Sequence, residues 1–80
     1  MIPLYGFLEG DSIGLLVLAD ENDTAADLAE KLQSAARMRV KTEAKVRVVH
    51  QGVIIGPHTT VAQAQMTALD RFDVIKAELR

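Results

Sequence analysis

The sequence contains no cysteine, and this absence excludes several kinds of chemistry together. Without a thiol the chain cannot form disulfides, ligate an iron–sulfur cluster or a zinc ion through thiolates, or attack a substrate with a sulfur nucleophile. Proline is also scarce, with two residues in 80, whereas 49% of the residues are hydrophobic. This balance indicates a folded chain rather than a disordered one.

Long hydrophobic runs and an excess of basic charge are missing as well. No apolar run reaches the roughly 18 residues that a membrane-spanning helix requires. The N-terminus lacks the basic start and the long apolar core of a signal peptide. The formal net charge of −2 gives no electrostatic reason to expect a nucleic-acid partner. We therefore expect a soluble cytoplasmic protein that binds neither membranes nor nucleic acid.

The length predicts a single domain, residues 1–80, with a small core. A chain of this size buries only about 60–65% of the surface that its unfolded form exposes. Charge is unevenly spread along it: five of the nine basic residues lie between Arg37 and Arg47, and seven of the eleven acidic residues lie between Glu9 and Glu30. Helix-dipole preference and loop solvation account for this distribution, and the alternative is a bipolar surface that orients docking.

Residues 23–38 are the only long segment with helical periodicity. Spacings of three and four residues gather an apolar set on one face of the helix: Ala25, Leu28, Ala29, Leu32, Ala35 and Ala36. The opposite face takes a polar set: Asp27, Glu30, Lys31, Gln33 and Ser34. Thr24 is placed to cap the first turn, with Asp27 as its reciprocal partner three residues later. A single apolar stripe must pack against something, and the rest of the chain supplies only a sheet.

The segments on either side of this helix are predicted to form extended strands. Residues 2–8 and 13–19 form a predicted hairpin with Gly10 and Asp11 at the centre of its turn, because Gly10 tolerates a positive φ. This register gives three pairs: Leu8 with Ile13, Gly6 with Leu15 and Leu4 with Val17. Further strands are predicted at residues 46–51, 53–55 and 72–79, and residues 59–66 contain a turn capped by Thr60.

A hairpin, one long helix and a C-terminal strand that returns beneath the helix are typical of the β-grasp fold. We therefore predict an α+β architecture in which a mixed sheet of four to five strands packs on one α-helix. The last strand should run parallel to the first, in the middle of the sheet. In this register Tyr5, Phe7, Leu16 and Leu18 point away from the helix. Both faces of the hairpin are then apolar, whereas a sheet with one wet side normally alternates apolar and polar residues.

Candidates for catalysis and for metal binding are weak. Ser12 and Ser34 have no histidine nearby in the sequence, so we predict no catalytic residue. His50 and His58 stand on either side of the Gly52 turn but lack a local carboxylate. The acidic cluster at residues 20–23 lacks the central glycine and the closing glutamate of a calcium loop, and helix capping explains it better. We expect no metal site and no cofactor bound by this chain.

The segments resemble known families at two levels. The helix start at Asp23-Thr24, the hairpin around Gly52, the Thr60-Val61 turn and the strand at residues 72–79 fall at ubiquitin-like intervals. More narrowly, the chain resembles the gamma subunit, or system protein B, of toluene monooxygenase-type hydroxylases. The shared residues are Pro3, Glu9, Asp11, Leu16-Val17, Asp20, Asn22-Asp23, Ala29-Glu30-Lys31, Val46, Val48, Met66 and Asp73-Val74-Ile75.

The resemblance implies a non-catalytic ubiquitin-like subunit of a multicomponent aromatic or alkene monooxygenase. Its partner would be the large diiron hydroxylase subunit. The resemblance implies no iron ligand from this chain.

Two alternative functions are also considered. A ubiquitin-like modifier or sulfur carrier needs a C-terminal Gly-Gly, where this sequence has Ala77-Glu78-Leu79-Arg80. A stand-alone interaction domain, or a homodimer formed through the same patch, is the other.

The ubiquitin-like register also places Val49 and Ile75 on the side of the sheet that faces away from the helix. The predicted partner interface is therefore Tyr5, Phe7, Leu16, Leu18, Val49 and Ile75. Contiguous apolar patches on small proteins usually mark interfaces. The alternative is that these side chains are scattered, or covered by residues 39–45 and the chain ends. Burial of Leu16, Leu18, Val49 and Ile75, or their separation by hydrophilic neighbours, would remove the basis for predicting docking through this patch.

Overall fold

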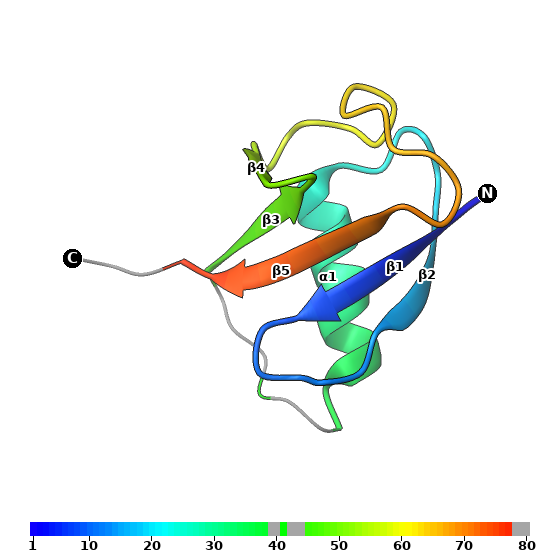
Figure 1. Ribbon diagram of the computed structural model, residues 1–80. Helices are drawn as coiled ribbons and strands as arrows, with labels where there is room; N and C mark the ends of the chain where they lie inside the picture. Colours follow the sequence, from blue (N-terminus) through cyan, green and yellow to red (C-terminus); the bar gives the residue numbers. More distant parts are fainter. Residues whose placement is uncertain (39–40, 42–44, 78–80) are drawn as a thin grey trace.

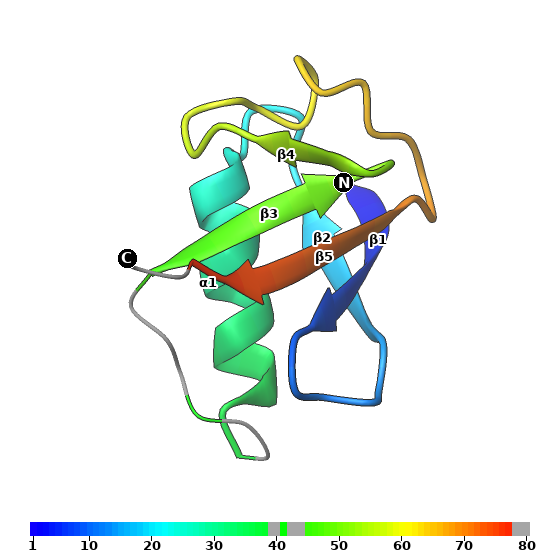
Figure 2. The ribbon, with the colours of Figure 1, turned by 60° about the vertical axis from the view of Figure 1, so that its left-hand side comes forward.

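The computed structural model describes residues 1–38, 41 and 45–77. Its elements are β1 (Ile2–Leu8), β2 (Leu15–Ala19), α1 (Ala25–Ala36), β3 (Val46–His50), β4 (Val53–Ile55) and β5 (Arg71–Lys76). The strands form one sheet in the order β2-β1-β5-β3-β4, and α1 crosses one face of it (Figure 1; Figure 2). Strand β5 occupies the middle of the sheet, parallel to β1. The predicted α+β arrangement and the parallel central strand are therefore confirmed.

Helix α1 begins as its sequence predicts. The backbone N–H of Asp27 donates to Thr24 Oγ1 at 3.2 Å, and the N–H of Thr24 donates to Asp27 Oδ2 at 3.0 Å. These two bonds satisfy donors that the first turn would otherwise leave unpaired. The helix ends at a C-cap on Arg37.

Two helix residues take the opposite environment from the one expected. Gln33, assigned to the polar face, is 8% exposed, whereas Ala35, assigned to the apolar stripe, is exposed. At about 100° per residue, these two positions flank the stripe on opposite sides. The helix is rotated so that the sheet covers its Gln33 side and leaves its Ala35 side exposed. Periodicity alone locates the stripe but does not decide which of its two margins is covered.

The β1–β2 hairpin keeps the predicted register but opens earlier than expected. Leu4 pairs with Val17 and Gly6 with Leu15, whereas the expected Leu8–Ile13 pair is absent because β2 begins at Leu15. The N–H of Glu9 donates to the carbonyl of Val74 at 2.8 Å, so the end of β1 follows β5 instead. Residues 9–14 therefore form a wider loop, and the prediction of a strand over residues 13–19 was too long.

The other strand ends also differ slightly from their predictions. Gln51, expected in a strand, has φ 54° and joins Gly52, φ 77°, in the turn between β3 and β4. Strand β5 begins one residue early, at Arg71, and ends at Lys76, so the prediction of a strand over residues 72–79 was too long. Residues 78 and 79 of that predicted strand lie outside the described ranges.

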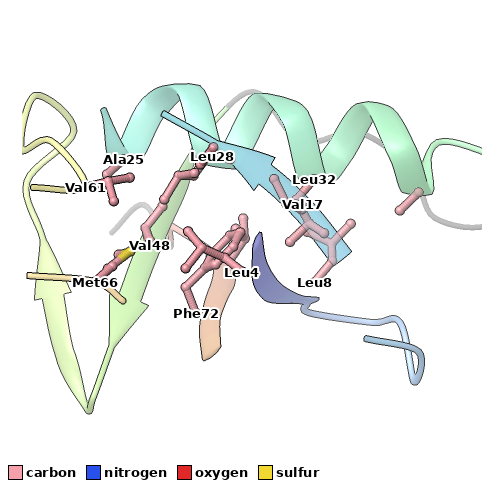
Figure 3. Packing of buried hydrophobic residues seen from close by; sticks show 14 residues of the cluster. Leu4, Leu8, Val17, Ala25, Leu28, Leu32, Val48, Val61, Met66 and Phe72 are labelled. Carbon is pink, nitrogen blue, oxygen red and sulfur yellow. The ribbon is translucent and has the colours of Figure 1, made fainter. Parts of the chain in front are cut away.

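The core lies between α1 and the face of the sheet that the helix covers (Figure 3). Its most completely buried large side chains are Phe72, Leu4, Leu28, Leu32, Val61 and Val74. Val61 comes from the predicted Thr60 turn. There the N–H of Gln63 donates to Thr60 Oγ1 at 3.1 Å, and the N–H of Thr60 donates to Gln63 Oε1 at 3.0 Å. This turn closes one end of the core. No helix in the described part of the chain is long and apolar enough to cross a membrane.

Asp70 joins three parts of the fold just before β5. Its carboxylate accepts bonds from the backbone N–H and the hydroxyl of Thr67 at 3.0 and 3.2 Å, and it lies 3.1 Å from Nε2 of the buried His50. Its backbone carbonyl accepts from the N–H of Tyr5 in β1. An ionised carboxylate only accepts hydrogen bonds, so His50 Nε2 carries the proton of this contact. The bonds from Thr67, and then the one from His50, lower the pKa of Asp70 below its ordinary value of 3.8.

Replacement of Gly6 by alanine should destabilise the fold. An added Cβ would lie 2.8 Å from Phe72 Cζ and 2.9 Å from Leu32 Cδ1, both inside the core. Overpacking of this kind costs about 1–3 kcal/mol of unfolding free energy, measurable by urea denaturation. Gly56→Ala is the matched control, because its nearest contact would be Thr59 Oγ1 at 3.4 Å and its stability should change little. Equal stability of the two variants would contradict this account of Gly6.

The Asp70 carboxylate should make stability depend on acid pH. Because its folded-state pKa is lowered, its contribution is fully present above the ordinary pKa of 3.8 and is lost as the pH falls through the folded value. Asp70→Asn should therefore be less stable than the parent at neutral pH, with the difference narrowing below pH 3.8. Thermal unfolding of both proteins across this range measures the effect. A constant difference at every pH would show that the carboxylate charge is not involved.

Candidate interaction surface

The sheet face opposite α1, called the outer face below, carries all six residues of the predicted interface. Cross-strand partners share a face, and the register pairs Tyr5 with Leu16 and joins Phe7 and Val49 through their common partner Asp73. Leu18 and Ile75 follow by alternation along β2 and β5. The predicted orientation of the six side chains therefore agrees with the strand pairing.

The six residues differ in exposure. Tyr5, Leu16 and Leu18 are 43%, 56% and 52% exposed, and they lie together on β1 and β2. Phe7, Val49 and Ile75 are half-buried. The strongly exposed part of the predicted surface is therefore one corner, the Tyr5–Leu16–Leu18 group.

A charged pair separates the residues of the predicted patch on β1 and β2 from Val49 on β3. Arg71 Nε lies 2.9 Å from Asp73 Oδ1, and both residues project from β5, the central strand. Asp73 stands between Phe7 of β1 and Val49 of β3. The expectation of one continuous apolar patch was therefore wrong, and docking through all six residues as one patch is not supported. The Tyr5–Leu16–Leu18 group remains as the strongly exposed apolar part of the predicted surface. Arg71 and Asp73 alternate in step with Ile75, so the strand pattern itself contained the signal for their outward position.

Phe7 packs within the surface more than it projects from it. The Arg71 guanidinium lies 4.1 Å from the centre of the Phe7 ring, a cation–π distance. The outer edge of the ring closely approaches Gly14, where a Cβ would lie 2.5 Å from Phe7 Cζ. Phe7 is thus in close contact with both a glycine backbone and a guanidinium group. It supports the position of Arg71 on the outer face.

Sequence reasoning missed one apolar residue of the outer face. Ile54 in β4 pairs with Val49 and is 55% exposed. The two-residue turn at Gln51 and Gly52 fixes this pairing, so the signal was available once the turn was located. Val49 and Ile54 form a second, smaller apolar group on the far side of the charged pair.

The candidate metal and nucleophile residues are placed as ordinary parts of the fold. His50 is buried against Asp70, whereas His58 is exposed in the loop after β4. Across residues 1–38, 41 and 45–77, no three histidine, aspartate or glutamate side chains are grouped to hold a metal ion. Ser12 and Ser34 are both exposed, on the loop after β1 and on α1.

In the acidic cluster before the helix, the Asp23 carboxylate makes hydrogen bonds and an ion pair that support the fold. Asp23 Oδ2 accepts the N–H of Asp20 at 3.0 Å and lies 2.8 Å from Lys31 Nζ. Lys31 lowers the pKa of Asp23, and Asp23 raises the pKa of Lys31. Lys31 Nζ also donates to the carbonyl of Leu18 at 2.9 Å, so it links α1 to β2. These contacts organise the start of the helix and its position on the sheet.

Solved structures with the same fold include a toluene 4-monooxygenase chain and ubiquitin-like chains. A chain of the toluene 4-monooxygenase HD complex with the inhibitor 4-bromobenzoate is 24% identical, with a TM-score of 0.87 over 95% of this chain and 98% of that one. Caldiarchaeum subterraneum ubiquitin is 14% identical, with a TM-score of 0.78 over 98% and 95%. A chain from a structure on molecular mimicry of SUMO is 18% identical, with a TM-score of 0.75 over 91% and 88%. The fold is therefore the ubiquitin-like β-grasp.

Sequence comparison gives the narrower assignment. A search of curated protein sequences finds no match. The family model described as toluene-4-monooxygenase system protein B (TmoB) matches residues 1–75, nearly the whole chain. The resemblance noted from the sequence is thereby confirmed, and the chain belongs to the toluene-4-monooxygenase system protein B family.

Proposed function

We propose that this chain, a non-catalytic accessory subunit of a toluene monooxygenase-type system, docks on the large hydroxylase subunit through its outer face. The accessory role follows from its family. The docking surface is our inference from the geometry. Such docking would place the chain in the compartment of its partner, which we propose is the cytoplasm.

The observation that supports this surface most strongly is the Tyr5–Leu16–Leu18 group. Large apolar side chains on paired strands are held in place, so burying them costs little additional ordering. All three are about half exposed in the chain by itself. Full burial of an exposed leucine side chain contributes about 1.5–3 kcal/mol. Leu16 and Leu18 are already about half buried, so a partner that covers them gains roughly half of that value from each. Tyr5 adds a hydroxyl that suits the polar edge of an interface.

The Arg71–Asp73 pair supplies the polar part of the same surface. The guanidinium is held over Phe7 and bonded to Asp73 at 2.9 Å, so its direction is fixed before any partner arrives. Fixed charges of this kind contribute to specificity and to the orientation of docking more than to affinity. The proposed partner surface therefore combines an apolar area opposite Leu16 and Leu18 with polar groups opposite β5.

A homodimer through the outer face is the second candidate, and the same exposed corner motivates it. A twofold interface would place the corner against its own copy, which is the usual geometry of small homodimers. Light scattering of the isolated chain at increasing concentration separates the two candidates. A concentration-dependent dimer that dissociates when Leu16 is changed would favour the homodimer.

The double variant Leu16→Lys, Leu18→Lys should lose most of its affinity for the large hydroxylase subunit. At roughly half of 1.5–3 kcal/mol for each half-exposed leucine, the lost burial corresponds to a weakening of about 10- to 100-fold. Co-purification and titration calorimetry with the co-expressed large subunit measure the change. Met38→Lys is the matched control, because Met38 is also an exposed large apolar residue but lies beyond the end of α1. Undiminished binding by the double variant would rule out the outer face as the docking surface.

A further inference from the structure

A groove of about 790 Å³ runs between α1 and the edge of the sheet formed by β3 and β4. Small side chains form much of its helix wall, because Ala25, Ala26 and Ala29 line it. The sheet wall includes Val46, Val48, Ile55 and Pro57. The groove is therefore wide and largely apolar, and it lies on a different side of the molecule from the exposed corner on β1 and β2.

The sheet edge beside this groove is only partly covered. Strand β4 pairs with Val48, Val49 and His50 of β3. In the described part of the chain, Val46 and Arg47 have no strand neighbour on that side, although both belong to β3. An open sheet edge presents backbone groups that an added extended segment can pair with. The groove thus offers an apolar floor beside an edge suited to an extended chain.

The charges that line the groove are mainly basic. Among the described residues, its lining includes three basic residues and one acidic residue, all of them exposed: Arg37, Lys45, Arg47 and Glu30. Three positive charges and one negative charge give a local excess of two positive charges, whereas the chain as a whole has a net charge of −2. Electrostatic complementarity therefore favours an acidic occupant.

The groove is continuous with the outer face. Ile54 pairs with Val49 of the outer face and also lines the groove. Arg47 pairs with Ile75 of the outer face and lines the groove as well. These two residues stand where the two surfaces meet. A partner that covers the outer face can therefore extend around the β4 edge without leaving the surface.

We propose that an extended acidic segment of the large hydroxylase subunit lies in this groove, beside the open edge of β3. Its apolar side chains contact Ala26, Val46 and Ile55, and its carboxylates face Arg37 and Lys45. This inference rests on the proposed function, because it gives the same partner a second contact. The outer face anchors the large subunit through apolar burial, and the groove captures its acidic segment.

Matched charge variants test the groove in the intact chain against the intact large hydroxylase subunit. Arg37→Gln with Lys45→Gln should weaken binding roughly tenfold at low salt and should reduce the salt dependence of the affinity. Glu30→Gln, in the same groove, should instead strengthen binding about twofold. Ala26→Trp fills the groove without changing its charge and should weaken binding at every salt concentration. All these positions are exposed, and thermal unfolding confirms that each variant is folded.

The outer-face double variant, Leu16→Lys with Leu18→Lys, separates this inference from the proposed function. If that variant loses affinity while the groove variants bind as the parent does at all salt concentrations, the groove inference is overturned and outer-face docking stands. If the groove variants lose affinity while the outer-face variant does not, the groove contact stands and outer-face docking is overturned. Loss in both sets supports both contacts, and loss in neither overturns both.

Discussion

In the described part of the chain, one helix of 12 residues covers only one face of the five-stranded sheet, and most features of this molecule depend on that limit. The covered face forms one continuous core with α1 and the Thr60 turn (Figure 3). The opposite face has no second layer in the described structure, so its residues meet either water or another protein. The residues of this outer face can therefore indicate a protein partner, whereas the core residues cannot. The half-exposed Leu16 and Leu18 are the clearest such indication.

The part of the fold that follows from local pattern was predictable from the sequence. The Thr24 capping box and the hairpin register depend on residues close together in the chain, and both agree with expectation. The prediction errors lie where contacts between residues distant in the sequence determine the structure. The end of β1 follows β5 through the Glu9–Val74 bond, which shortens β2 and leaves Ile13 outside the ladder. The rotation of α1 toward Gln33 is likewise set by the sheet beneath it.

The interaction surface was predictable in orientation but not in continuity. Alternation along β1 and β2 correctly placed Tyr5 and Leu16 on the face opposite the helix. Continuity depended on β5, whose outward residues include Arg71 and Asp73 as well as Ile75. The groove beside β4 could not have been predicted, because it depends on how α1 is placed against the β3–β4 edge of the sheet. Sequence periodicity assigns residues to faces, but it does not describe the spaces between elements.

The charged pair that divides the outer face has a physical consequence for the free subunit. Exposed apolar strands favour self-association when they form one broad surface, and charges placed among them oppose it. Arg71 and Asp73 neutralise each other at 2.9 Å while both remain well exposed, with side chains 63% and 36% accessible. Covering them requires a partner that replaces their lost water contacts, which a second apolar surface does not provide. A partner with suitably placed polar groups replaces these water contacts. The charged pair therefore disfavours nonspecific association but allows docking of a specific partner.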